Sequence, residues 1–125
     1  MHLILDTSIV IELERKNKEI ISKLEELKEI YPSHPKISFI TYFEILEGIS
    51  RKSEENREKA KAFLELFDVI QTTKITAQNL VILREKYEFP MPDLLIASHV
   101  METNSVLVTK DTDFEQIEEI EKIIL

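Results

Sequence analysis

The sequence predicts an α/β fold in which helices cover both faces of a central parallel sheet. Short apolar runs at residues 3–5 and 106–109 have the length and composition of buried strands. Segments with helical spacing of apolar residues separate these runs from further short strand-like runs. Strands that alternate with helices favour a parallel sheet. The chain has 125 residues and no linker, repeat or low-complexity segment, so we expect one domain over residues 1–125.

The composition excludes several kinds of protein. There is no cysteine, which rules out disulfides and thiolate metal sites, so any metal must be held by oxygen ligands, with at most a histidine among them. No apolar run is long enough to cross a membrane and no signal peptide is recognisable, so we expect a cytoplasmic protein. The net charge of −8 argues against a basic nucleic-acid-binding surface, but it does not exclude a nucleic-acid enzyme.

The first half of the chain alternates strands with helices. Residues 3–5 form the first strand, and Asp6 follows it directly, either as the N-cap of the next helix or as a site residue. Within the helix at 40–51, the apolar residues from Tyr42 to Ile49 share one side, and Thr41, Glu44 and Glu47 share the other. The spacing does not separate Glu44 from Glu47. The expected elements are helices at 9–14 and 18–30, a strand at 36–39 and the helix at 40–51.

The second half continues the pattern. Ser53 is the expected N-cap of a charged helix reaching residue 67, and Thr76 that of the following helix. The basic residues near 51–61 are interleaved with Glu54, Glu55 and Glu58, which favours a salt-bridged surface over a phosphate-binding patch. Gly48 suggests close packing within its helix. The remaining expected elements are a strand at 69–70, an apolar helix at 94–101, a strand at 106–109, a short helix from 112 and a strand at 122–125.

Acidic residues follow two strands and begin a buried helix. Asp6 and Asp111 come just after apolar runs, so a parallel sheet brings them to the same edge, and Asp93 lies in the first turn of the apolar helix that precedes the second run. Taken singly, Asp93 only complements the helix dipole. His99, on the same helix, is expected to be a packed residue rather than a ligand. Clustered carboxylates repel one another, and a divalent metal would relieve the repulsion and assist phosphodiester hydrolysis.

The order and spacing of four segments resemble the PIN domain family, and most of all its VapC-type toxins. The segments are Leu5-Asp6-Thr7-Ser8, Phe43-Glu44-Ile45-Leu46-Glu47-Gly48, Asp93-Leu94-Leu95-Ile96-Ala97 and Leu107-Val108-Thr109-Lys110-Asp111-Thr112-Asp113-Phe114. The resemblance implies a flavodoxin-like parallel sheet and an endoribonuclease dependent on Mg²⁺ or Mn²⁺.

The resemblance also implies roles for individual residues. The metal-binding acids of the family match Asp6, Glu44, Asp93 and Asp111, which would be catalytic, and Asp113 matches a further acid found in many members. It leaves open whether Asp111 or Asp113 touches the metal. Three hydroxyl residues match positions that support the site by hydrogen bonds: Thr7, Ser8 and Thr109. The segment from Tyr87 to Met91 lacks a glycine that is often present before the third acid, and Pro90 and Pro92 are expected to reshape this entrance, which bears on substrate access.

The resemblance implies partners as well. An RNA substrate, a homodimer and a small antitoxin protein are expected, and the helices at 9–14 and 18–30 would offer part of the antitoxin's groove. Two alternatives stand beside the nuclease. One is a non-catalytic module that binds RNA or protein, although such a module would not require all four acids. The other is a Mg²⁺-binding receiver domain, which fits poorly because Asp6 stands alone after its strand and Gln71-Thr72-Thr73 follows Ile70.

Overall fold

A parallel sheet of five strands organises the protein, as the computed structural model of residues 1–125 shows. The strands lie in the order β3-β2-β1-β4-β5, and every neighbouring pair is parallel. The predicted fold class is therefore confirmed. The strands are β1 (Leu3–Leu5), β2 (Lys36–Ser38), β3 (Asp68–Ile70), β4 (Val106–Thr109) and β5 (Glu121–Ile124).

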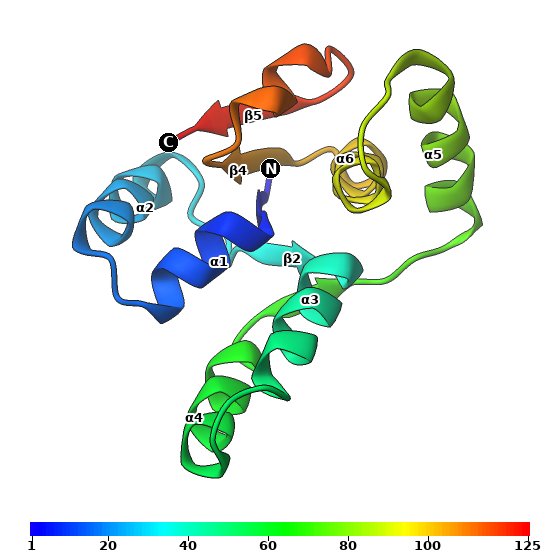
Figure 1. Ribbon diagram of the computed structural model, residues 1–125. Helices are drawn as coiled ribbons and strands as arrows, with labels where there is room; N and C mark the ends of the chain where they lie inside the picture. The colour runs from blue at the N-terminus through cyan, green and yellow to red at the C-terminus, as the bar shows by residue number, and fades with distance from the viewer.

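Helices cover both faces of this sheet, with α5 and α6 together on one side and α1 and α2 on the other (Figure 1). The helices are α1 (Thr7–Glu14), α2 (Lys18–Ile30), α3 (Phe39–Ile49), α4 (Glu54–Leu64), α5 (Lys74–Lys86), α6 (Met91–Thr103) and the short 3₁₀ helix η1 (Thr112–Gln116). None of these helices is long and apolar enough to span a bilayer.

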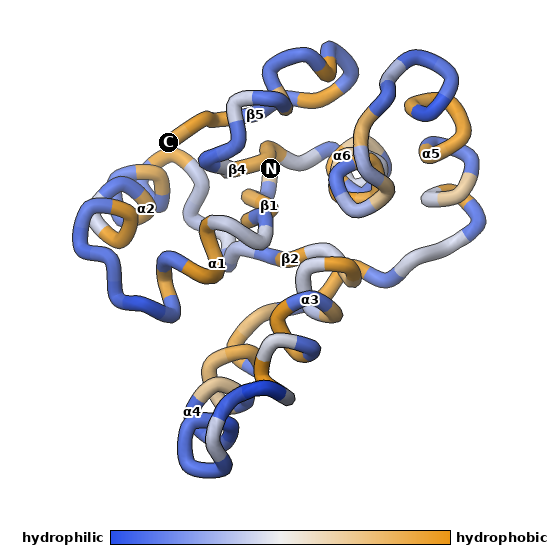
Figure 2. The backbone as a smooth tube through the Cα atoms, in the orientation of Figure 1, coloured by the Kyte–Doolittle hydropathy of each residue, from blue (hydrophilic) through white to orange (hydrophobic).

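The alternation of side chains along each strand divides the core into two halves. Leu3 and Leu5 face the half formed by α1 to α4, whereas Ile4 faces the half formed by α5, α6 and η1. Strand β4 and the C-terminal half of β5 are hydrophobic, whereas the turn between α1 and α2 is hydrophilic (Figure 2). Because both faces of β1 and β4 are buried, their sequences are continuous apolar runs.

Three local expectations were wrong. Helix α3 buries Thr41, Ile45 and Ile49, whereas Phe43 is 47% exposed, so the apolar side inferred from spacing is only partly the buried side. The N-cap of α5 is Thr73, and Thr76 sits three residues later as its partner in a capping box. Gly48 has open space where a Cβ would lie, so close packing does not explain this glycine.

Some helix ends also differ from the prediction. The first helix begins at Thr7 rather than Ile9, and α4 ends at Leu64, three residues before the expected end. Ser53 occupies the N-cap position of α4 but its side chain makes no capping hydrogen bond. Just after the end of α1, Lys16 adopts the left-handed conformation with φ 59°.

Candidate active site

Asp6 lies where β1 ends and α1 begins, at the carboxyl edge of the sheet. It is the N-cap of α1, because its Oδ1 accepts the backbone N–H of Ile9 at 3.1 Å, and the same oxygen accepts the hydroxyl of Ser8 at 2.6 Å, so capping leaves Asp6 at the edge where a site residue is expected. Only 5% of Asp6 is exposed, and this burial raises the pKa of its carboxyl above 3.8, against the lowering effect of the hydrogen bonds. The two roles of Asp6 that the sequence left open are therefore compatible.

Strand β4 orients Asp6 from the neighbouring position in the sheet. Thr109, the last residue of β4 and fully buried, donates its hydroxyl to Oδ2 of Asp6. The same hydroxyl oxygen accepts the N–H of Asp111 at 3.0 Å, and the Ser8 hydroxyl oxygen accepts the N–H of Lys110 at 3.3 Å. Thr109 and Ser8 thus join the loop carrying Asp111 to the carboxylate of Asp6.

Glu44 reaches the same edge from the middle of α3. Its Oε1 accepts the hydroxyl of Thr7 at 2.7 Å, and that hydroxyl lies 3.1 Å from the hydroxyl of Thr41. Glu47, one turn further along the helix, is exposed, and the charges that raise the pKa of Asp93 include Glu44 but not Glu47. The structure therefore places Glu44 rather than Glu47 with Asp6.

Asp93 enters the cluster from the first turn of α6. Pro90 is the N-cap of this helix and a second proline occupies its first turn, which fixes the chain where the carboxylate projects. Burial, first of all, and then the negative charges of Asp111, Asp6, Glu44 and Asp113 raise the pKa of Asp93 to about 6. All five predicted acids therefore belong to one electrostatic cluster. No protein group donates a hydrogen bond to the carboxylate of Asp93.

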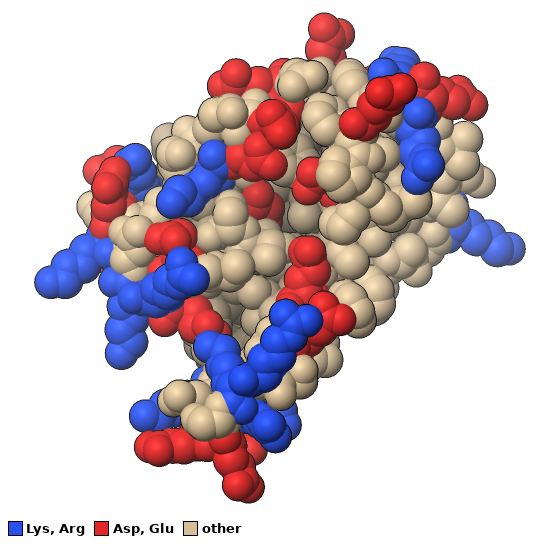
Figure 3. Space-filling view, viewed as in Figure 1, with Lys and Arg blue, Asp and Glu red and all other residues tan.

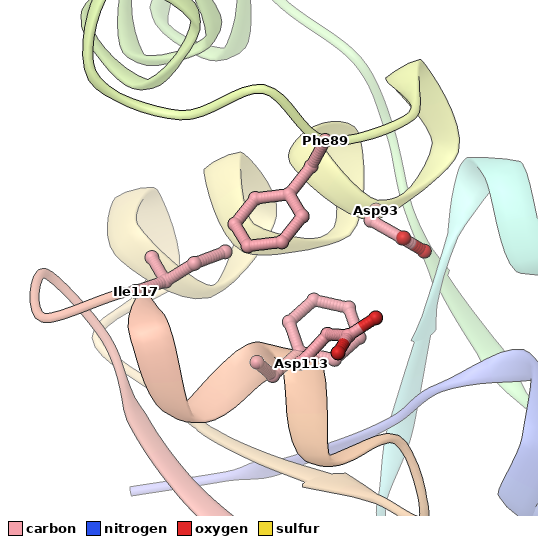
Figure 4. Close-up of a pocket in the computed structure, with 5 residues that line it drawn as sticks. Phe89, Asp93, Asp113 and Ile117 are labelled. Atoms are coloured by element: carbon pink, nitrogen blue, oxygen red, sulfur yellow. The ribbon is translucent and has the colours of Figure 1, made fainter.

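Asp113 and Asp111 occupy different positions on the loop that follows β4. Asp111 is half-buried and caps η1 by accepting the N–H of Asp113 at 2.9 Å. Asp113 is exposed and lines a small pocket with Asp93, Phe89, Phe114 and Ile117. In Figure 4 the carboxylates of Asp93 and Asp113 point to the same side of this pocket, while Phe89 and Ile117 form its apolar part.

No basic side chain neutralises these acids. The four ion pairs of the protein are Arg15–Glu12, Lys23–Glu19, Lys52–Glu14 and Lys86–Glu119, none of which includes a predicted site acid. Figure 3 shows acidic side chains lining a hollow in the middle of the face drawn, among uncharged atoms. An uncompensated cluster of carboxylates in a partly buried position attracts cations.

The donor set fits a hard divalent cation, although the carboxylates are not gathered around one point. No group of three or more acidic or histidine side chains is close enough to hold one ion as they stand. Asp6 and Glu44 are each held by hydroxyl groups, whereas Asp93 has no such restraint. Mg²⁺ commonly keeps several waters and takes only one or two protein carboxylates directly, so it does not require a complete cage.

The structure adds Thr41 to the surroundings of the acids, a role that the sequence pattern did not assign to it. Thr41 is fully buried beside Thr7 and helps to position Glu44. Its place three residues before Glu44 on one helix was a usable signal, because such residues are neighbours on the helix surface. His99 is fully buried, and its Nδ1 lies 2.8 Å from the Ser38 hydroxyl. It is a packed histidine, as expected, and burial lowers its pKa.

Comparison with solved structures finds the same fold in several chains. One is a chain of the crystal structure of VapBC2 from Rickettsia felis bound to a DNA fragment from the promoter. It has a TM-score of 0.83 at 23% identity, and the match covers 99% of this chain and 98% of that chain. Another, from a toxin–antitoxin complex of Klebsiella pneumoniae, has a TM-score of 0.78 at 24% identity, with 97% of this chain and 95% of that chain covered. A chain of VapBC-1 from nontypeable Haemophilus influenzae has a TM-score of 0.77 at 23% identity, with 99% and 98% covered.

Comparison with curated proteins finds no match. The family model of the PIN domain, in contrast, matches residues 3–120, a span that holds all five predicted acids and the three hydroxyl residues beside them. This match extends over nearly the whole chain and agrees with the fold and with the resemblance noted in the sequence. The chain therefore belongs to the PIN domain family.

Proposed function

We propose that this protein is an endoribonuclease dependent on Mg²⁺ or Mn²⁺, with Asp6, Glu44, Asp93 and Asp111 as its catalytic, metal-binding acids. The observation that carries the proposal is that these carboxylates lie at one sheet edge without any basic partner. Burial of Asp93, together with the negative charges of the other acids, raises its pKa to about 6. PIN domains are generally nucleases, and family membership also removes the receiver-domain alternative.

The residues around the acids have defined tasks in this proposal. A bound divalent cation would supply an activated water and would stabilise the leaving oxygen. Thr109 and Ser8 hold Asp6, and Thr7 holds Glu44, so these carboxylates keep their orientation before substrate arrives. Asp93 accepts no hydrogen bond and is free to turn toward the cation.

We assign the metal-ligand role to Asp111 in preference to Asp113. Asp111 is half-buried, and its charge raises the pKa of both Asp6 and Asp93. Asp113 is exposed, and its charge contributes least to the pKa of Asp93. Asp113 is then an outer acid of the site, facing the substrate side of the small pocket.

The direct test is cleavage of a structured RNA mixture by the purified protein with Mg²⁺, with Mn²⁺ and with a chelator. We expect cutting with either metal and none with chelator, and no cutting by Asp6→Asn. A folded protein that binds RNA but cuts nothing would instead support the non-catalytic binding module. Equal cutting by the wild type and Asp6→Asn would contradict the assigned site.

We further propose that the protein is the toxin of a type II toxin–antitoxin pair. The similar chains named above come from toxin–antitoxin complexes. An acidic site without basic partners suits a basic side chain of an inhibitor. Beside α2, between this helix and the segment that precedes β2, lies a recess of about 200 Å³ with Leu13, Ile21 and Leu24 in its wall, which suits the apolar side chains of a helix or tail.

This second proposal has its own test. The product of a small neighbouring open reading frame should inhibit RNA cleavage, and Ile21→Glu should weaken the inhibition about tenfold, which corresponds to roughly 1.4 kcal/mol of binding free energy. Glu26→Gln, an exposed change on the same helix, is the matched control. Cleavage that this product leaves unaffected would remove the toxin assignment and leave the nuclease standing.

A homodimer is proposed from the exposed apolar stripe of α3. Phe39, Phe43 and Leu46 are 42%, 47% and 40% exposed, and their spacing puts them on one side of the helix. Large apolar side chains grouped on a surface mark interfaces more often than scattered ones do.

A further inference from the structure

We propose that a lysine-lined groove beside the acidic site holds the phosphate backbone of the RNA, an inference that rests on the proposed nuclease function. The groove is defined by Arg15, Lys16, Lys52 and Lys59, from the end of α1, the α3–α4 turn and α4. It gives the substrate a basic binding surface that adjoins the carboxylates, which by themselves repel phosphate.

Two adjoining hollows make up the groove. The first, of about 490 Å³, is lined by Thr7 and Glu44 at one end and by Arg15 and Lys52 further out. The second, of about 430 Å³, is lined by Lys16, Lys52 and Lys59. Lys52 and Glu14 line both hollows, so the path is continuous from the acidic site to the lysines.

The charge of the groove changes sign along its length. The first hollow contains three acids, Glu14, Glu44 and Glu47, and two basic residues. The second contains three lysines and only one acid, Glu14. Basic side chains gather at the α3–α4 end of the molecule, below the hollow that the acids line (Figure 3). An RNA strand would thus be bound by its phosphates at the basic end of the groove, and the neighbouring nucleotides of the same strand would reach the acids.

Two of the four basic residues of the groove, Lys16 and Lys59, form no ion pair. The sequence indicated that Glu54, Glu55 and Glu58 pair with the basic residues here, but none of these three acids forms an ion pair, so this part of the interpretation was wrong. Lys52 pairs with Glu14 at 3.2 Å, and Arg15 pairs with Glu12 at 3.6 Å while its side chain is 72% exposed. Lys16 and Lys59 have no acidic partner.

Two further observations fit an RNA strand. Phe63 and Leu13 lie in the wall of the second hollow and offer apolar surface to a base or ribose, since unpaired bases commonly pack on aromatic side chains. Lys16 has φ 59°, a conformation in which glycine is usual at a helix end. The sequence therefore has a lysine at a position where the backbone conformation favours glycine.

The test measures binding of a short labelled single-stranded RNA by anisotropy over a range of salt, with Ca²⁺ in place of Mg²⁺ and the RNA checked for integrity. We expect the double variant Lys16→Gln/Lys59→Gln to bind RNA about tenfold more weakly. The slope of log K against log salt should become shallower by about 1.4, because each of the two lost phosphate contacts contributes about 0.7 to the slope. The control, Lys74→Gln/Arg84→Gln, removes the same charge from exposed positions on α5, on the other side of the sheet, and should change neither value.

Three outcomes overturn the proposal: no measurable RNA binding by the wild type, equal slopes for the lysine variant and the wild type, and tighter binding of poly-glutamate than of RNA through the same lysines. The last outcome would assign the groove to an acidic partner protein.

RNA cleavage by the same variants separates the two proposals. If Asp93→Asn abolishes cutting while the lysine variant binds RNA normally, the RNA-binding role of the groove is contradicted and the nuclease function is supported. If the lysine variant loses RNA binding while neither the wild type nor any variant cuts RNA, the RNA-binding role of the groove is supported and the nuclease function is contradicted.

Discussion

The hydroxyl of Thr109 donates a hydrogen bond to Oδ2 of Asp6, although 103 positions separate the two residues in the chain. Because β1 and β4 are neighbours in the sheet, the last residue of one strand can hold the carboxylate that follows the other. This hydrogen bond joins the two sequence segments that first indicated an acidic cluster. It also makes the orientation of Asp6 depend on a residue that is itself neither acidic nor a proposed ligand.

Replacing Thr109 tests this dependence. Thr109→Val keeps the shape of the buried side chain but removes the donor, so we expect Mg²⁺ affinity and RNA cleavage to fall by about 10- to 100-fold, the usual effect of removing a group that supports a metal ligand. Thr109→Ser keeps the hydroxyl and should retain most of both. Calorimetric titration with Mg²⁺ and cleavage rates provide the two readouts. If valine and serine behaved alike, the hydrogen bond would have no role in positioning Asp6.

The raised pKa of Asp93 predicts how stability depends on pH. Its pKa is about 6 in the folded protein against 3.8 for the ordinary carboxyl, so the folded state binds the proton more tightly than the unfolded state does. The free energy of unfolding therefore falls as pH rises from about 4 to about 6, and the loss is complete above that range. Solvent screening of this half-buried group limits the effect to about 1 kcal/mol.

Denaturant unfolding in chelator at several pH values measures this effect. Asp93→Asn should be more stable than the wild type above pH 6, by about 1 kcal/mol, and should show a flatter pH profile. Adding Mg²⁺ should stabilise the wild type and leave the variant almost unchanged. A variant that is less stable than the wild type in chelator at neutral pH would mean that Asp93 is not under repulsion.

Lys16 offers a change that should separate stability from function. Lys16→Gly relieves the left-handed backbone at the end of α1 and should stabilise the protein by about 1 kcal/mol. The same change removes a cation from the lysine groove, so RNA binding should weaken. Thermal unfolding and the anisotropy titration check the two halves of this prediction. A stabilised variant with unchanged RNA binding would show that Lys16 does not contact the RNA.

The exposed stripe of α3 predicts a change in oligomeric state. Phe43→Asp would place a charge in the centre of an apolar interface, so we expect a dimeric wild type and a monomeric variant by light scattering, with the fold intact because Phe43 is 47% exposed. Val81→Asp, at a 58% exposed position on α5, is the control for an apolar-to-acidic surface change. A wild type that is itself monomeric would rule out the proposed interface.

Much of the fold follows from local sequence patterns. The apolar runs of β1 and β4 are continuous because both faces of these strands are buried, and this makes them recognisable without any partner. The positions of Asp6 and Asp111 at one edge also follow, since parallel strands end together. The burial of Asp6 and its bond to Thr109 do not follow, because they depend on which strands are neighbours.

Helix α3 shows why the buried side of a helix was not predicted correctly from the sequence. Its apolar residues extend over more of the helix surface than the core covers, since Ile45 and Ile49 are buried while Phe43 is exposed, so spacing alone does not decide which of them face the core. The sheet and α1 select the side with Thr41, and Phe43 is left exposed. The lysine groove escaped prediction for a similar reason. It is formed by residues near the end of α1, in the α3–α4 turn and in α4 that are distant in the chain, and only the structure shows that Lys16 and Lys59 form no ion pair.

The most direct test of the central claim is the rate of RNA cleavage by Asp93→Asn beside Asp68→Asn at saturating Mg²⁺. Asp68 is an exposed acid at the start of β3, on the opposite edge of the sheet, so it carries the same change without belonging to the cluster. The account predicts at least a 100-fold loss for Asp93→Asn, about 2.7 kcal/mol in transition-state stabilisation, and no loss for Asp68→Asn. Equal rates for the two variants would show that the clustered carboxylates are not the active site.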